Sequence, residues 1–163
     1  MTAIKIRQAM PGDCTLILHF IRELAEYEKA LPEVVATEHD LQAVLFGAEP
    51  KAFALICTID ETPVGFALYF FNFSTWLGKY GLFLEDLYVS PEYRGSGAGK
   101  ALLKHLAKIA VDEECGRFEW NVLDWNTPAI DFYESVDAEP LHEWVGYRLT
   151  GDALRRFAGV NGH

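Results

Sequence analysis

A glycine-rich segment constrains the fold of this chain more than any other feature of its sequence. Glycine stands at every second position of the run Arg94–Lys100 (RGSGAGK). The strand-like segment Leu82–Val89 precedes this run, and residues 97–111 after it carry apolar side chains at helical spacing. Each glycine adds conformational entropy that folding must remove, so three of them at a strand-to-helix corner indicate a special backbone requirement. Successive N–H groups at the start of a helix bind phosphate, and the run predicts such a site.

Three phosphate-binding motifs were compared with this run. The P-loop pattern G-x-x-x-x-G-K-[ST] fails, because only three residues separate positions 95 and 99 and Lys100 is followed by Ala101 instead of a hydroxyl residue. The dinucleotide pattern G-x-G-x-x-G fails because Leu102 occupies its last glycine position. The pattern R-x-x-G-x-G matches from Arg94 to Gly99. A purely structural turn that packs the helix is the alternative.

The rest of the chain predicts an α/β fold, a mixed sheet with helices on both faces, in a single domain over residues 1–163. Strands are expected at Ile4–Ala9, Ala52–Asp60, Val64–Phe73, Leu82–Val89 and Arg117–Leu123, with one or two more in Leu141–Leu149. Helices are expected after the caps Asp13 and Thr37 (the second ending at Gly47), at Gly97–Val111 and at Pro128–Glu134. The residues Glu61-Thr62-Pro63 are expected to form the turn between the second and third strands.

The composition excludes several classes of partner. The formal net charge of −10 repels nucleic acid and anionic membranes and attracts small cations, although solubility alone also explains it. The longest apolar run, Val64–Phe73, is too short to span a membrane as a helix, and no secretion signal is evident, so a cytoplasmic protein is expected. Cys14, Cys57 and Cys115 form no C-x-x-C pair and are expected to be buried thiols. The five histidines lack H-x-x-x-H spacing, so no metal site is predicted.

The sequence around the glycine run resembles a known enzyme family. The strand-to-helix position of the R-x-x-G-x-G run resembles the coenzyme A pyrophosphate loop of the GNAT acetyltransferases. The segments LEDLYV before the run and WNTPAIDFY at 125–133 are similar to the spermidine/spermine (diamine) acetyltransferase branch and to its thialysine-acetylating relative. The resemblance covers nearly the whole chain. It implies a mostly antiparallel central sheet.

The resemblance implies that acetyl-CoA is the acyl donor. The loop residues expected to hold its pyrophosphate are Arg94, Gly95, Ser96, Gly97, Ala98, Gly99 and Lys100. Leu87 and Val89 are expected to pair through their backbones with the pantetheine, and a backbone N–H near Tyr88 or Val89 is expected to meet the oxyanion. Asn126 is expected near the coenzyme, although it could instead cap the following helix.

The expected chemistry needs a base and an acid. Glu85 and Asp86 interrupt an apolar strand, where adjacent side chains point to opposite faces, so only one is expected to face a given pocket. The resemblance assigns Glu85 as amine binder and proton acceptor, with Asp86 close by. It assigns Tyr133 as the acid that protonates the leaving thiolate. Without the resemblance, the carboxylates could be edge charges and Tyr133 a core residue.

The acceptor pocket is expected to be acidic and partly aromatic. The resemblance assigns the following residues to it: Tyr27, Glu28, Glu33, Trp76, Glu85 and Asp86. It also implies a homodimer whose acceptor groove draws on both subunits. One departure is Asp137, which stands where the family has glycine; aspartate tolerates left-handed backbone better than most residues.

We therefore expect an N-acetyltransferase that moves the acetyl group of acetyl-CoA to a primary amine of a small cation, a polyamine or a thialysine-like or lysine-like compound. The expected mechanism is direct attack in a ternary complex. The alternatives are acetylation of a protein amine or of an aminoglycoside-type amine, and a non-catalytic acyl-CoA sensor.

Overall fold

The structure, a computed structural model, describes residues 3–160. The chain divides into two compact units, Met1–Asn121 and Val122–His163, and each is described by itself. The single domain over residues 1–163 stays a prediction. No helix within residues 3–160 is long and apolar enough to cross a membrane.

The first unit is built on a sheet of five strands in the order β1-β2-β3-β4-β5. Their bounds are β1 Ile4–Gln8, β2 Phe53–Ile59, β3 Thr62–Ser74, β4 Lys79–Val89 and β5 Arg117–Trp120. Neighbouring strands from β1 to β4 are antiparallel, whereas β5 lies parallel to β4. The predicted mixed, mostly antiparallel sheet is confirmed.

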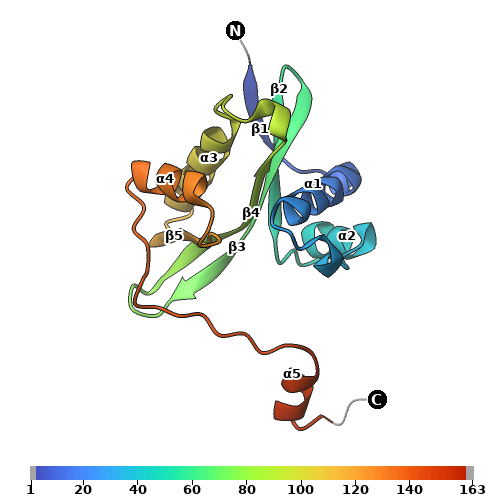
Figure 1. Cartoon of the computed structure of the whole chain (residues 1–163), viewed down its shortest axis with the longest axis vertical. Helices are drawn as coiled ribbons and strands as arrows, with labels where there is room; N and C mark the ends of the chain where they lie inside the picture. Colours follow the sequence, from blue (N-terminus) through green and yellow to red (C-terminus); the bar gives the residue numbers. More distant parts are fainter. Residues whose placement is uncertain (1–2, 161–163) are drawn as a thin grey trace. The chain divides into compact units, whose positions relative to one another are not determined.

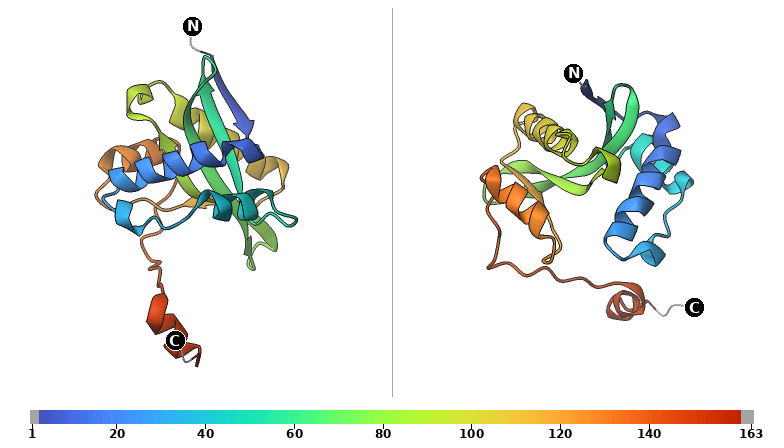
Figure 2. Two further views of the ribbon diagram at one scale, coloured as in Figure 1. Left: turned by 90° about the vertical axis from the view of Figure 1, so that its right-hand side faces the viewer. Right: turned by 45° about the horizontal axis from the view of Figure 1, so that its top comes forward.

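Helices cover both faces of this sheet (Figures 1 and 2). The helices α1 (Cys14–Tyr27) and α2 (Glu38–Phe46) lie on one face, and α3 (Ala98–Asp112) lies on the other. Short 3-10 turns at Pro11–Asp13 (η1), Leu31–Glu33 (η2) and Pro91–Tyr93 (η3) join these elements. The turn η3 leads from the end of β4 into the glycine run, and this run therefore starts at the carboxyl end of a sheet strand.

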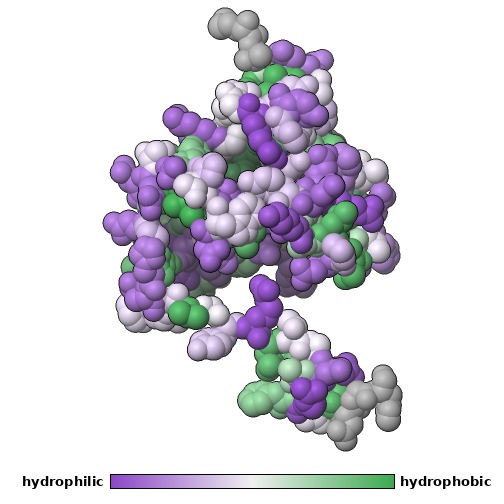
Figure 3. Space-filling view, viewed as in Figure 1, coloured by the Kyte–Doolittle hydropathy of each residue, from purple (hydrophilic) through white to green (hydrophobic). Residues whose placement is uncertain are grey.

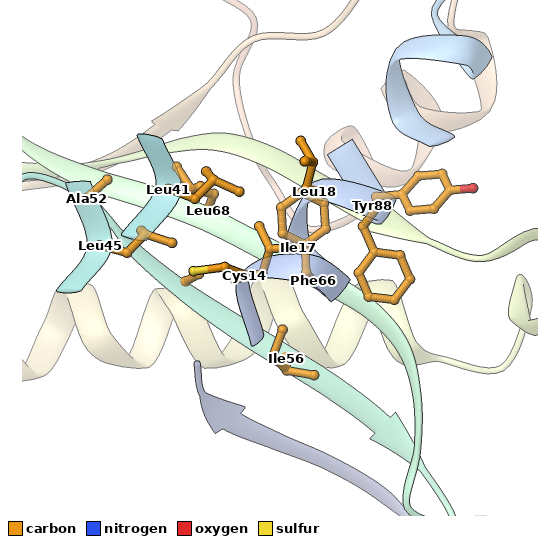
Figure 4. Close-up of a cluster of buried hydrophobic side chains, with 12 residues drawn as sticks. Cys14, Ile17, Leu18, Leu41, Leu45, Ala52, Ile56, Phe66, Leu68 and Tyr88 are labelled. Carbon is orange, nitrogen blue, oxygen red and sulfur yellow. The ribbon is translucent and has the colours of Figure 1, made fainter. Parts of the chain in front are cut away.

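A cluster of buried apolar side chains packs α1 and α2 against one face of the sheet. Ile17, Phe66 and Ile56 in this cluster are fully buried, and Leu68 is 9% exposed. Tyr88 lies at one end of the cluster and points its hydroxyl away from the apolar side chains (Figure 4). The surface seen in Figure 3 is mostly polar, with apolar residues scattered between polar ones.

One predicted helix cap is confirmed and one is wrong. Thr37 Oγ1 accepts from the Asp40 N–H at 3.2 Å, and the Asp40 carboxylate accepts from the Thr37 N–H at 2.8 Å, which is the predicted capping box. Asp13 precedes α1 without a side-chain capping bond. Its carboxylate instead accepts hydrogen bonds from Arg7, at 2.7 and 2.9 Å, and from the N–H of Met10, at 2.7 Å, so it is bound by residues that precede it and not by the first turn of α1.

The turn between β2 and β3 is shorter than predicted. It consists of Asp60 and Glu61, both at positive φ (48° and 71°), and Thr62 and Pro63 already belong to β3. Two central residues at positive φ define the hairpin turn whose twist matches its strands. Pro63 is accommodated because the β2–β3 register shifts beside it, between Cys57 and Thr58.

The second unit contains α4 (Thr127–Ser135) and α5 (Gly151–Phe157). The predicted helix at Pro128–Glu134 is confirmed, with Pro128 in its first turn. The strands predicted in Leu141–Leu149 are wrong for the chain as described, which has no strand there. A strand needs a neighbouring strand for its backbone groups, and alternating apolar side chains do not supply one. Asp137 adopts the left-handed conformation expected of the family's glycine, at φ 68°.

Candidate active site

A β-bulge in β4 determines where its two carboxylates point. Leu68 of β3 lies opposite Asp86, and the next residue, Tyr69, lies opposite Leu84. Glu85 therefore has no partner on β3 and is the extra residue of the bulge. Because of the bulge, the alternation of side chains along β4 is interrupted at this residue.

Because of the bulge, strand alternation no longer requires Glu85 and Asp86 to point to opposite faces. Residues directly opposite each other on neighbouring strands share a face, so Asp86 lies on the face of Leu68, which packs in the cluster under α1 and α2. Leu84 lies opposite Tyr69 and so on the other face. Asp86 therefore lies on the α1 face of the sheet, and Glu85 is the unpaired residue beside it.

The electrostatics of Asp86 show that a third carboxylate lies near this pair. Burial, together with the charges of Glu85 and Glu28, raises the pKa of Asp86 from 3.8 to about 6. Burial also raises the pKa of Glu28, which follows the last residue of α1. Glu28, Glu85 and Asp86 thus form an acidic cluster, half-buried at Asp86, that favours a cation.

The pairing of β4 with β5 ends just before the bulge. Its register covers Gly81–Leu84 of β4 and Arg117–Trp120 of β5. Within residues 3–160, the part of β4 from Asp86 to Val89 pairs with β3 alone. Its other edge is therefore a place where an extended chain can add as a further strand, as expected for Leu87 and Val89.

The glycine run has the geometry of an anion site. Gly95 and Gly97 adopt positive φ angles of 84° and 94°, and Gly97 is the N-cap of α3. The N–H of Ala98 donates to Ser96 Oγ at 3.3 Å. Within residues 3–160, the N–H groups of Gly95, Gly97, Gly99 and Lys100 donate to no backbone carbonyl. These N–H groups lie at the positive end of the α3 dipole and can bind a phosphate.

Arg94 links this loop to its surroundings. Its Nε donates to the carbonyl of Val89 at 3.3 Å. Its guanidinium carbon lies 5.0 Å from the ring centre of Tyr27 and 5.8 Å from that of Tyr88. Tyr27, predicted on the acceptor side, therefore also contacts the predicted coenzyme loop.

The structure does not bring every predicted residue to the acidic cluster. Glu33 is exposed in η2, five residues beyond Glu28. Trp76 lies in the turn after β3 and is 90% exposed. The turn that holds it precedes Lys79, and the six residue steps from Lys79 to Glu85 span about 20 Å of strand. Trp76 therefore lies outside the acidic cluster of its own chain.

Asn126 and Tyr133 belong to the second unit. Asn126 is the N-cap of α4 but forms no side-chain capping bond, so the capping alternative does not describe its side chain. Tyr133 is half-buried in α4, and its ring lies 5.8 Å from that of Phe132. Asn126 therefore lies at the start of α4, and Tyr133 lies within this helix.

One residue of the site was not predicted from the sequence. Glu23 of α1 accepts a hydrogen bond from the Tyr88 hydroxyl at 2.8 Å. The sequence gives only a weak signal for Glu23. A tyrosine in an apolar strand needs a hydrogen-bond partner for its hydroxyl, but the sequence does not say which residue is that partner.

Comparison with known proteins agrees with this geometry. The profile of the acetyltransferase (GNAT) family matches residues 19–137. A thialysine N-epsilon-acetyltransferase from Sus scrofa is 43% identical, over 98% of this chain and 99% of the relative. The L-ornithine N5-acetyltransferase NATA1 from Arabidopsis thaliana is 31% identical, over 96% of this chain and 89% of the relative. An integron cassette protein from V. cholerae superposes with a TM-score of 0.79 at 29% identity, covering 95% of this chain and 97% of that one.

The fold and these relatives define an amine N-acetyltransferase. The chain belongs to the GNAT acetyltransferase family. Members of this family generally use acetyl-CoA.

The raised pKa of Asp86 predicts a pH-dependent stability. A carboxyl whose pKa is higher in the folded state contributes stability that is fully present below its unfolded-state pKa and is lost as the pH rises through about 6. Asp86→Asn should therefore be more stable than the wild type at pH 8, by on the order of 1–2 kcal/mol, and about equally stable at pH 4. Urea unfolding at both pH values measures this difference. The exposed Asp131→Asn is the control, and an equal change in both variants would contradict the prediction.

Proposed function

We propose that this protein transfers the acetyl group of acetyl-CoA to a primary amine of a small amino acid that carries a second cationic group, such as thialysine or ornithine. The carrying observation is the group of three neighbouring carboxylates, Glu28, Glu85 and Asp86, at the bulge of β4, just before the strand leads into the glycine run. The substrates named for the pig and Arabidopsis relatives support an amino-acid acceptor. A polyamine is also a small multivalent cation and is the alternative acceptor within the same class.

The described residues fit the diphosphate of coenzyme A. The chain carries a formal charge of −10, so a doubly charged diphosphate needs local donors. Backbone N–H groups from Gly95 to Lys100 supply donors without many cationic side chains, and Arg94 and Lys100 add local positive charge. The open edge of β4 at Leu87–Val89 would hold the pantetheine in an extended form, with the N–H of Tyr88 or Val89 at the oxyanion. Asn126 completes the proposed coenzyme site.

The acidic cluster would bind the acceptor ammonium and take its proton. An alkylamine has a pKa near ~10.4, so producing the free amine at pH 7 costs about 4–5 kcal/mol. Glu85, exposed on the bulge, is the proposed proton acceptor, directly or through water. Glu28 and Asp86 hold the positive charge, and the ring of Tyr27 adds an aromatic face. Glu33 lies on the following turn and would extend this acidic surface.

Tyr133 would donate a proton to the departing sulfur. A thiol has a pKa near ~8.5, so protonation of the thiolate assists its release. The proposed attack of the amine on the thioester is direct. An acyl-enzyme would need an activated nucleophile, whereas Cys14 and Cys57 are buried, Cys115 is half-buried rather than buried as predicted, and burial raises the pKa of all three thiols. The three unpaired thiols also fit the proposed cytoplasmic location.

A homodimer would cover apolar side chains of the second unit and bring Trp76 to an acceptor site. Trp144, Val145 and Tyr147 are 68%, 73% and 97% exposed in a segment without helix or strand. Contiguous exposed apolar residues are typical of an interface. Trp76 lies outside the acidic cluster of its own chain, so its proposed role in acceptor binding requires the groove of a second copy.

Sedimentation equilibrium tests the dimer. The wild type should have twice the mass of one chain, and Tyr147→Glu should shift the equilibrium towards monomer, because it places a charge in the interface. Val111→Glu, at a residue 74% exposed on α3, is the matched control and should remain dimeric. A monomeric wild type would contradict the proposal.

A thiol-release assay with acetyl-CoA tests the proposed reaction. Thialysine, ornithine, lysine, putrescine, spermidine and spermine are compared as acceptors, with lysine-containing peptides and an aminoglycoside as alternatives. We expect kcat/KM for thialysine or ornithine to exceed that for the peptides and the aminoglycoside by at least about tenfold, equivalent to about 1.4 kcal/mol in transition-state stabilisation. Activity confined to peptides would overturn the small-amine proposal, and activity with no amine would favour an acyl-CoA sensor.

Tyr133→Phe separates the proposed acid from coenzyme binding. Removal of the hydroxyl should lower kcat by about 10²–10⁴-fold, the usual contribution of general acid catalysis, and leave the Kd of coenzyme A within about twofold. Steady-state kinetics and calorimetry measure the two quantities. Tyr80→Phe, at an exposed tyrosine of β4, is the control. Full turnover in Tyr133→Phe would contradict the assignment.

A further inference from the structure

Arg94 contacts two tyrosines that come from different parts of the first unit. Tyr27 is the last residue of α1, and Tyr88 is the penultimate residue of β4. The guanidinium carbon lies 5.0 Å and 5.8 Å from their ring centres, within the range of a cation–π contact. Arg94 is also the first residue of the glycine run, so a single side chain joins the proposed coenzyme loop to the end of α1.

Tyr88 anchors this arrangement in the core. It is 5% exposed and packs against Phe20, and its hydroxyl donates to Glu23 of α1 at 2.8 Å. Glu23 in turn contacts His19 one turn earlier. The Tyr88 ring is thus fixed by its contacts with Phe20 and Glu23. Tyr27, which is 40% exposed, is the more exposed of the two rings that contact Arg94.

The position of Tyr27 matters because Glu28 follows it directly. Glu28 belongs to the acidic cluster, since its charge acts on Asp86. A contact that orders Tyr27 therefore also restrains the adjoining backbone, which carries one proposed acceptor-binding carboxylate. The Arg94 charge also disfavours a cationic acceptor beside Tyr27 until an anion neutralises it.

We propose that the Tyr27–Arg94–Tyr88 contact is a positioning link: a diphosphate bound at the glycine run restrains and neutralises Arg94, orders the last turn of α1, and thereby favours binding of the amine. This inference rests on the proposed function and adds to it a coupling between the two substrates. Because coupling in binding is reciprocal, the amine tightens coenzyme binding by the same factor. Of the three residues, Tyr27 and Tyr88 act through Arg94 and are positioning residues.

Calorimetry with coenzyme A measures the link in the full-length protein. We expect the wild type to bind coenzyme A about 5–20-fold more tightly with saturating thialysine than without it, a moderate coupling. In Tyr27→Leu this ratio should fall to within about twofold of 1. Tyr27→Phe, which keeps the ring, should retain the wild-type ratio, and so should Tyr80→Leu as the matched control. A wild-type ratio in Tyr27→Leu, or an equal loss in Tyr27→Phe, would overturn the link.

Hydrogen exchange of the wild type supplies a test that needs no variant. Coenzyme A alone should slow exchange of the backbone amides of residues 25–30 at least about threefold, because the link orders this turn. Unchanged exchange there, with coenzyme A bound, would overturn the link and leave the proposed function intact. A wild type that binds no coenzyme A would instead overturn the proposed function.

Discussion

One extra residue in β4 is the constraint on which the site depends. Without the bulge at Glu85, strand alternation would send Glu85 and Asp86 to opposite faces, and one would enter the packing beneath α3. With it, Asp86 lies on the face of α1, and the charges of Glu85 and Glu28 act on it. The pairing of β4 with β5 also stops at Leu84, immediately before the bulge. A single irregularity therefore coincides with both the acidic cluster and the free strand edge.

An acidic chain that binds a dianionic donor and a cationic acceptor must separate two opposite electrostatic requirements. In the proposed site, these requirements fall on different kinds of group. Backbone amides at the start of α3 would face the donor, and carboxylates on β4 and at the end of α1 would face the acceptor. Amides supply positive potential without a net charge, so they do not neutralise the nearby carboxylates. Arg94 is a full cation between the two regions, held by aromatic faces instead of a carboxylate.

The relatives and the site constrain the acceptor in different ways. The carboxylate cluster requires a cation but accepts a polyamine as readily as an amino acid, because both carry ammonium groups. The full-length similarity to a thialysine acetyltransferase supports the proposed amino-acid acceptor. The end of α1 and the turn after it, where Tyr27, Glu28 and Glu33 lie, are where such a preference would be built.

The sequence by itself determined the elements whose signals are local. The glycine run, the Thr37–Asp40 capping box and the left-handed Asp137 follow from backbone chemistry within a few residues, and all three appear as predicted. Only the tertiary structure decided what depends on partners far along the chain. The register of β3 against β4 created the bulge, Arg7 took the carboxylate of Asp13, and residues 141–149 formed no strand. Periodicity specifies which face of a strand is apolar, but a register shift or a competing ion pair is settled only when distant segments meet.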